Sequence, residues 1–197
     1  MSILSTSALW SSLRPEPEHF EDAASGRRLR PAVLRDMVTR IAATPDIWAD
    51  YVRFDFYERH AVRLHFDDDF DVWLICWEFG QETLLHDHGG SVGSFAVARG
   101  ALFEDYGDRR GSTLRTRELT TGESSAFGAE YLHNVVNVSA TPAVSIHAYS
   151  LPLRAMNFFC WLPSGPRHLR EIRCDTPEPD TTALEADAAR MRAEVRA

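Results

Sequence analysis

Residues 72–90 read VWLICWEFGQETLLHDHGG and join an apolar run to a pair of histidines across a short polar stretch. Trp73 and Trp77 fall on one side of an extended chain, because successive side chains of a strand point to opposite faces. His86 and His88 are also two residues apart, so both imidazoles would lie on the same side of a strand. The stretch therefore predicts two β-strands, the second carrying an HxH pair.

Short strand-like runs continue on both sides of this stretch. The alternation in YVRFDFY (51–57) predicts a strand before it. Further strands are expected at 62–66, 72–79, 94–98, 101–106, 114–119, 131–138 and 144–150. Gly, Asp, Ser and Pro separate these runs. Many short strands with close turns and no intervening helices predict an antiparallel sandwich or barrel.

Helical patterns lie only before and after the strands. The first begins at Pro31, a residue suited to a first helical turn, and its apolar face comprises Val33, Leu34, Met37, Val38 and Ile41. A short C-terminal helix is indicated by the stripe Leu184, Ala188, Met191 and Val195. We therefore expect a surface segment over 1–30, one β domain with its N-terminal helix over 31–174, and an acidic connection with a helix over 175–197.

Composition excludes several classes of protein. The 197 residues carry 29 acidic and 21 basic side chains, all of the latter arginine, and a formal net charge of −8. This balance argues against nucleic-acid or anionic-membrane partners. No secretory signal or membrane-spanning run is visible, so a cytoplasmic protein is expected. Three cysteines without CxxC spacing (Cys76, Cys160 and Cys174) indicate neither a disulfide framework nor a zinc knuckle, and we interpret them as structural.

A third histidine strengthens the case for a metal site. His133 lies in GESSAFGAEYLHNVVN (122–137), on another alternating run, and a barrel can bring it to the HxH pair. Imidazole is a common ligand of first-row metals, although surface histidines are the alternative at this point. No carboxylate follows the pair, because positions 92 and 93 are Val and Gly. Three neutral imidazoles would leave a redox metal such as Fe(II) open to a thiolate and dioxygen.

At this point the sequence resembles a known family. Gly80-x5-His86-x-His88 with Gly100, and Gly122 to His133-x3-Asn137, resemble the two cupin motifs. The segments ICWEFGQETLLHDHGGS and SIHAYSLP resemble the thiol dioxygenases, and within them the cysteine dioxygenases. The resemblance runs from about residue 51 to residue 161. It implies an all-β cupin fold, a double-stranded β-helix or jelly-roll barrel, with N-terminal helices and a short C-terminal helix.

The resemblance also implies a reaction and a set of site residues. One Fe(II) per chain would be bound by His86, His88 and His133, and L-cysteine and O2 would give cysteine sulfinate. Arg53 would hold the substrate carboxylate, with Tyr51 nearby. Tyr149 would stand over the iron, with His147 and Ser145 behind it in a polar relay. The residues alone leave other interpretations open: a solvated strand face at 145–149, and a surface Arg53 paired with Asp55.

Two positions bear on the type of thiol dioxygenase. Some family members carry a cysteine at the position of Gly93, cross-linked to the tyrosine that Tyr149 matches, so no cross-link is expected here. Arginine at position 53 favours cysteine over mercaptopropionate as substrate. The alternatives are a dioxygenase for another small thiol, such as 3-mercaptopropionate, and a non-catalytic cupin that binds a metal or a small ligand. A monomer is expected.

Overall fold

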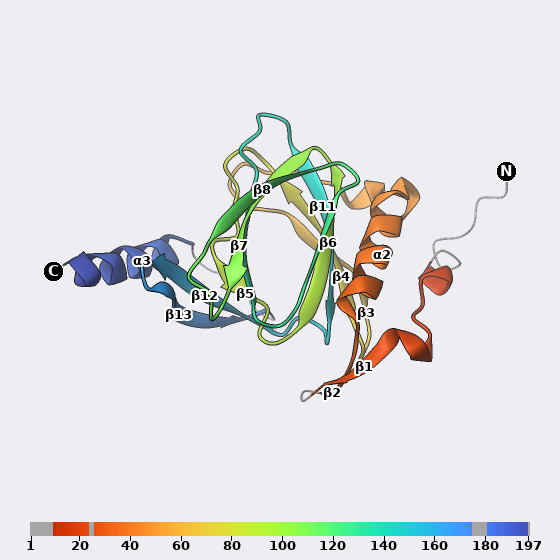
Figure 1. Ribbon diagram of the computed structural model, residues 1–197. Coiled ribbons are helices and arrows are strands. Elements are labelled where there is room, and N and C mark those ends of the chain that lie inside the picture. Colours follow the sequence, from red (N-terminus) through yellow and green to blue (C-terminus); the bar gives the residue numbers. More distant parts are fainter. Residues whose placement is uncertain (1–9, 24–25, 175–180, 197) are drawn as a thin grey trace.

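The computed structural model of the chain describes residues 10–23, 26–174 and 181–196. Most of its strands form two antiparallel sheets that face each other across the interior (Figure 1). The five-stranded sheet has the order β3 (Ala61–Phe66), β4 (Asp71–Trp77), β11 (Ala143–Ser150), β6 (Val92–Arg99) and β9 (Ser124–Phe127). The six-stranded sheet has the order β13 (Gly165–Arg173), β12 (Ala155–Leu162), β5 (His86–Asp87), β10 (Tyr131–Val136), β7 (Ala101–Asp108) and β8 (Arg115–Thr120). The predicted class of antiparallel strands with close turns is confirmed.

The helices cover the outside of the sheets. Helix α2 (Pro31–Ala42) packs on the five-stranded sheet through its buried apolar face. Helix α3 (Thr181–Arg196) lies at the opposite side of the molecule against β12, where Leu184 and Ala188 are buried (Figure 1). Both predicted helices are confirmed. Within the described residues, no helix is long and apolar enough to cross a membrane.

Short elements complete the N-terminal part. A hairpin of β1 (Phe20–Ala23) and β2 (Gly26–Leu29) precedes α2, and the 3-10 helices are η1 (Pro17–His19), η2 (Pro45–Ile47) and η3 (Ala49–Tyr51). The backbone N–H of Leu29 donates to Ser150 Oγ at 3.0 Å, which ties the hairpin to the end of β11. The first 30 residues were expected only to wrap the surface, so this hairpin is an addition. Most of the predicted acidic connection, residues 175–180, lies outside the described residues.

The structure corrects one prediction from alternation and adds a hairpin that alternation did not predict. Residues 51–57 form no strand: η3 ends at Tyr51 and irregular chain follows. The Asp55 carboxylate accepts the backbone N–H groups of Tyr57 and Glu58 at 2.7 and 3.2 Å, and this local turn replaces strand pairing. The β12–β13 hairpin, in contrast, was missed, because charged and aromatic residues interrupt its alternation.

Candidate metal centre and its pocket

Three histidines converge between the two sheets. His86 on β5 lies directly opposite His133 in the antiparallel pairing with β10, and His88 follows β5 by one residue. One ring nitrogen from each lies within 4.8 Å of the others, and the Nε2 atoms of His88 and His133 are 3.2 Å apart. All three side chains are buried. The predicted proximity of these three histidines is therefore confirmed.

The outer ring nitrogens of the three histidines have different surroundings. His86 Nδ1 lies 2.8 Å from the carbonyl oxygen of Leu84, whose left-handed backbone (φ 60°) turns that oxygen toward the ring. His133 Nδ1 lies 2.8 Å from Glu104 Oε1. His88 Nδ1 is buried without a hydrogen-bond partner among the described residues, and its ring stacks on Phe127 with centroids 4.7 Å apart. Two of the three rings thus have a fixed tautomer, with Nε2 facing the centre.

The protonation state of the cluster favours a metal ion. Burial lowers the pKa of His86 and of His88 well below the usual histidine value, and the neighbouring imidazoles lower these pKa values further. Neutral imidazoles keep an unprotonated nitrogen as ligand. The donor set therefore fits one divalent first-row metal ion.

Glu104 is a buried carboxylate that the sequence did not reveal as part of the site. It lies on β7 and is fully buried. Besides His133, it accepts a hydrogen bond from the Tyr131 hydroxyl at 2.9 Å and one from Arg117 Nε at 2.7 Å. Burial opposes its ionisation, but the contacts with His133 and Arg117 outweigh this and hold the pKa of Glu104 below its usual value. The group is therefore an anion directly behind one ring of the cluster.

A second polar chain runs along β11. Trp77 Nε1 donates to Ser145 Oγ at 2.8 Å, and Ser145 Oγ lies 2.7 Å from His147 Nε2. His147 Nδ1 lies 3.3 Å from the hydroxyl of Tyr149. Burial lowers the pKa of His147 and raises that of Tyr149, so both groups are neutral at physiological pH.

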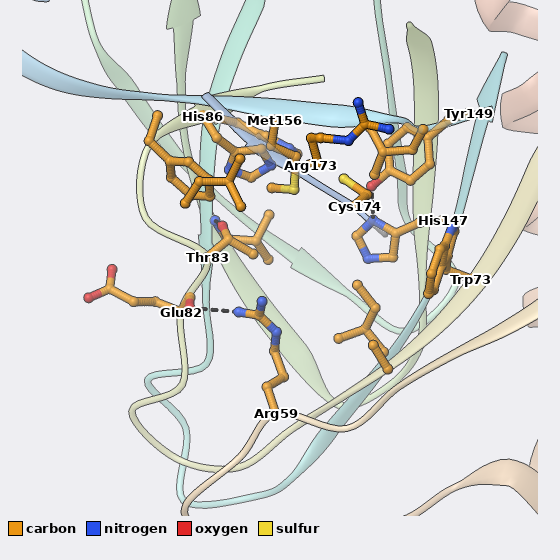
Figure 2. A pocket seen from close by; sticks show the side chains of 17 residues that line it. Arg59, Trp73, Glu82, Thr83, His86, His147, Tyr149, Met156, Arg173 and Cys174 are labelled. Carbon is orange, nitrogen blue, oxygen red and sulfur yellow. Dashed lines mark hydrogen bonds between the residues drawn. The ribbon is translucent and has the colours of Figure 1, made fainter. Parts of the chain in front are cut away.

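One pocket of about 170 Å³ connects these groups. Its walls include His86, His133, His147 and Tyr149, together with Arg59 from the segment before β3. Figure 2 shows the Arg59 guanidinium pointing into the cavity from the side opposite His86 and Tyr149. Two histidines of the cluster, a phenol and a guanidinium thus line the same cavity.

The comparison with known proteins agrees with this arrangement. Residues 30–160 match the family model described as cysteine dioxygenase type I. The chain belongs to the cysteine dioxygenase type I family. It is 29% identical over 137 residues to cysteine dioxygenase type 1 of Danio rerio, covering 64% of this chain and 68% of the relative. It is 32% identical over 127 residues to cysteine dioxygenase type 1 of Rattus norvegicus, covering 59% of this chain and 63% of the relative.

Solved structures are more distant. A protein with a double-stranded β-helix domain from Klebsiella pneumoniae superposes with a TM-score of 0.44 at 20% identity, over 52% of this chain and 84% of that chain. The cysteine dioxygenase type I family has the cupin fold, and the predicted cupin fold is confirmed in this chain. Its strands form two facing sheets, with few short helices outside them.

The structure does not bring Arg53 and Tyr51 to the pocket of this cysteine dioxygenase family member. Both side chains are exposed, and neither belongs to the pocket wall. The reason is the turn at Asp55, which takes the place of the expected strand, and the arginine of this segment that lines the cavity is Arg59. An Arg-rich irregular segment offers no spacing signal that would have distinguished these two arginines.

Two further positions are clarified. A Cβ at Gly93 would lie 2.5 Å from Phe127 Cε2 and 2.9 Å from Tyr149 Cδ1, so the Phe127 ring fills the space where a side chain would stand. The predicted structural role of Cys160 fits its contact with α3. Cys174, also interpreted as structural, lies instead in the pocket wall together with Arg173 (Figure 2).

Proposed function

We propose that the chain is a thiol dioxygenase that converts L-cysteine and O2 to cysteine sulfinate, with one Fe(II) held by His86, His88 and His133. The observation that carries the proposal is the shared pocket, which His86 and His133 of the histidine cluster line together with a guanidinium and a phenol. Bound Fe(II) would supply the redox chemistry that lets dioxygen react with a thiolate. The reaction balances as a thiolate plus O2 giving a sulfinate, with no further reductant.

Arg59, in place of Arg53, binds the substrate carboxylate in this proposal. Its Nη1 donates to the carbonyl oxygen of Glu82 at 2.6 Å, and its Cζ lies 4.8 Å from the centre of the Trp77 ring. These contacts fix the plane of the guanidinium at the pocket wall. A guanidinium has five N–H donors, so it keeps the bond to Glu82 while two others bind the carboxylate oxygens.

The Trp77–Tyr149 chain sets the direction of a hydrogen bond into the pocket. Trp77 is only a donor, so Ser145 Oγ accepts a hydrogen bond from it and donates its own hydroxyl hydrogen to a bond with His147 Nε2. Neutral His147 then carries its proton on Nδ1 and donates a hydrogen bond to the Tyr149 oxygen. The Tyr149 hydroxyl proton is left to point into the pocket, where it donates to the substrate or to the oxygen that attacks sulfur.

A dioxygenase for another small thiol is the second candidate, and Arg173 is the observation that favours it. Arg173, at the end of β13, lines the same pocket as Arg59. A carboxylate can therefore be bound from either of two sides. 3-Mercaptopropionate has the same thiol and carboxylate as cysteine but no amine, so its thiolate would take a single metal position and either guanidinium could bind its carboxylate.

Oxygen consumption with product analysis tests the proposal. Iron-loaded and zinc-loaded protein are each given cysteine or 3-mercaptopropionate under 18O2, and oxygen uptake and sulfinate mass are measured. We expect uptake only with iron, and a cysteine sulfinate that is heavier by two 18O atoms. Faster turnover of 3-mercaptopropionate would select the second candidate. No uptake with either thiol would overturn both and leave a non-catalytic binding cupin.

The proposal extends to the setting of the enzyme. We propose a cytoplasmic monomer whose partners are L-cysteine and O2, without nucleic acid or membrane, as the formal net charge of −8 favours. In a chain of this charge, an anionic substrate needs local positive charge, and Fe(II) with Arg59 provides it. Light scattering at micromolar concentration tests the monomer; a dimeric mass contradicts it.

A further inference from the structure

Glu104 and Arg117 form an ion pair behind one ligand of the histidine cluster. Glu104 Oε1 faces His133 Nδ1 at 2.8 Å, and Glu104 Oε2 faces Arg117 Nη2 at 2.6 Å. We propose that this pair tunes the metal centre through His133: Glu104 strengthens the ligand, and Arg117 limits that effect. Both are positioning residues, and the inference rests on the metal site of the proposed function.

The three ligands are unequal in a way that singles out His133. A neutral carbonyl oxygen faces His86, and no hydrogen-bond partner among the described residues faces His88. Among the three ligands, His133 alone has an anion behind it in the part of the chain that the structure describes. A carboxylate that accepts the Nδ1–H bond fixes the tautomer and raises the electron density at Nε2, which makes the ring a stronger metal ligand. Loss of such a partner typically lowers metal affinity by about 10- to 100-fold.

Arg117 sets how much negative charge reaches His133. It lies on β8 directly opposite Glu104 on β7, and it binds the carboxylate through both Nε and Nη2. Its Nη2 also donates to Ser125 Oγ at 2.5 Å, and its Cζ stands 4.5 Å from the ring centre of Tyr106. These contacts hold the guanidinium in one place. A fixed cation on the far side of Glu104 partly cancels its charge at the metal.

The arrangement predicts effects of opposite sign for the two residues. Replacing Glu104 by Gln keeps the shape and removes a negative charge, which disfavours Fe(III) relative to Fe(II) and raises the reduction potential. Replacing Arg117 by Gln removes the compensating positive charge and lowers the potential. A purely structural ion pair would behave differently, because either substitution would loosen the same strands and shift the potential in the same direction.

The test measures the metal centre without any thiol. Glu104→Gln and Arg117→Gln are compared with Glu118→Gln and Arg115→Gln, exposed neighbours on β8 that undergo the same changes of charge. Affinity for Fe(II) is measured by competition with a chromophoric chelator under argon. The Fe(III)/Fe(II) potential is measured by mediated spectrophotometric titration. Circular dichroism of each variant checks that it is folded.

The expected result has two parts. Glu104→Gln lowers the Fe(II) affinity by about 10- to 100-fold and raises the Fe(III)/Fe(II) reduction potential. Arg117→Gln lowers the reduction potential and keeps the Fe(II) affinity within a few fold of the wild type. Shifts of the same sign in both variants, or no difference from the two controls, overturn the inference while the proposed function stands. If Glu104→Gln fails to fold, the sign for Arg117→Gln still decides. Wild-type protein that binds no iron would overturn the proposed function and this inference together.

Discussion

The histidines and Arg59 reach the same pocket from two different kinds of chain. His86 and His133 lie on paired strands, where the register places one directly opposite the other. Arg59 lies in the irregular segment between η3 and β3, whose course is set by the turn at Asp55 and by a hydrogen bond from Gln81 Nε2 to the Asp55 carbonyl oxygen. In a strand, residue spacing predicts where a side chain points; in a turn, it does not.

The strand region predicts the largest effect. We expect His133→Ala to abolish iron binding and oxygen uptake, because two imidazoles without the carboxylate-backed ring leave too few ligands. Iron per chain after loading and desalting is the measurement. His168→Ala on β13 is the matched control and keeps its iron. If His133→Ala still held one iron per chain, the histidine cluster would not be the metal site.

The irregular segment predicts the next largest effect. Arg59→Gln should lower kcat/KM for cysteine by about 100-fold, because charge-assisted bonds to a buried carboxylate are worth about 1.5–3 kcal/mol each. Arg53→Gln removes the same charge from an exposed residue of the same segment and should stay within twofold of wild type. The reverse outcome, a large loss at position 53 alone, would restore Arg53 as the carboxylate anchor that the family resemblance implied.

These two regions also mark how far the sequence alone predicts the molecule. The two helices and most strands follow from period, and the histidine cluster follows from HxH spacing plus a third strand-borne histidine. Glu104 could not be found this way, because its partners His133 and Arg117 are 29 and 13 residues away and meet it only through strand pairing. Arg59 was missed because hydrogen bonds to the Asp55 side chain form a turn where the alternation predicted a strand.

A smaller effect tests how tightly the strand region is packed. Gly93→Ala should lower the free energy of unfolding by about 1–3 kcal/mol, because the added Cβ meets the Phe127 ring at 2.5 Å. Gly128 is the matched control, since nothing lies within 4 Å of its Cβ position. Urea unfolding of both alanine variants gives the two values. Equal stability would show that Phe127 moves aside at little cost.

The smallest effect concerns Asp71, a buried carboxylate on β4 opposite Tyr149 of β11. Burial raises the pKa of Asp71 from 3.8 to about 6, against the hydrogen bonds that it accepts from Trp73 Nε1 and the Leu153 N–H. The folded state then binds a proton more tightly than the unfolded state between pH 4 and pH 6. Stability from this group is therefore present at low pH and is lost as pH rises through about 6.

The direction of this pH dependence can be tested by urea unfolding at pH 5 and pH 7. The protein is first freed of metal by a chelator. The free energy of unfolding at pH 5 minus that at pH 7 should be about 1 kcal/mol more positive in the wild type than in Asp71→Asn. The buried histidines, whose lowered pKa values act in the opposite direction, are present in both proteins and cancel from this comparison. Asp68 is exposed on the preceding turn, and Asp68→Asn should keep the pH dependence of the wild type. If Asp71→Asn retained the full pH dependence, the carboxylate would be ionised throughout. The strand region would then tolerate a buried charge that its regular packing disfavours.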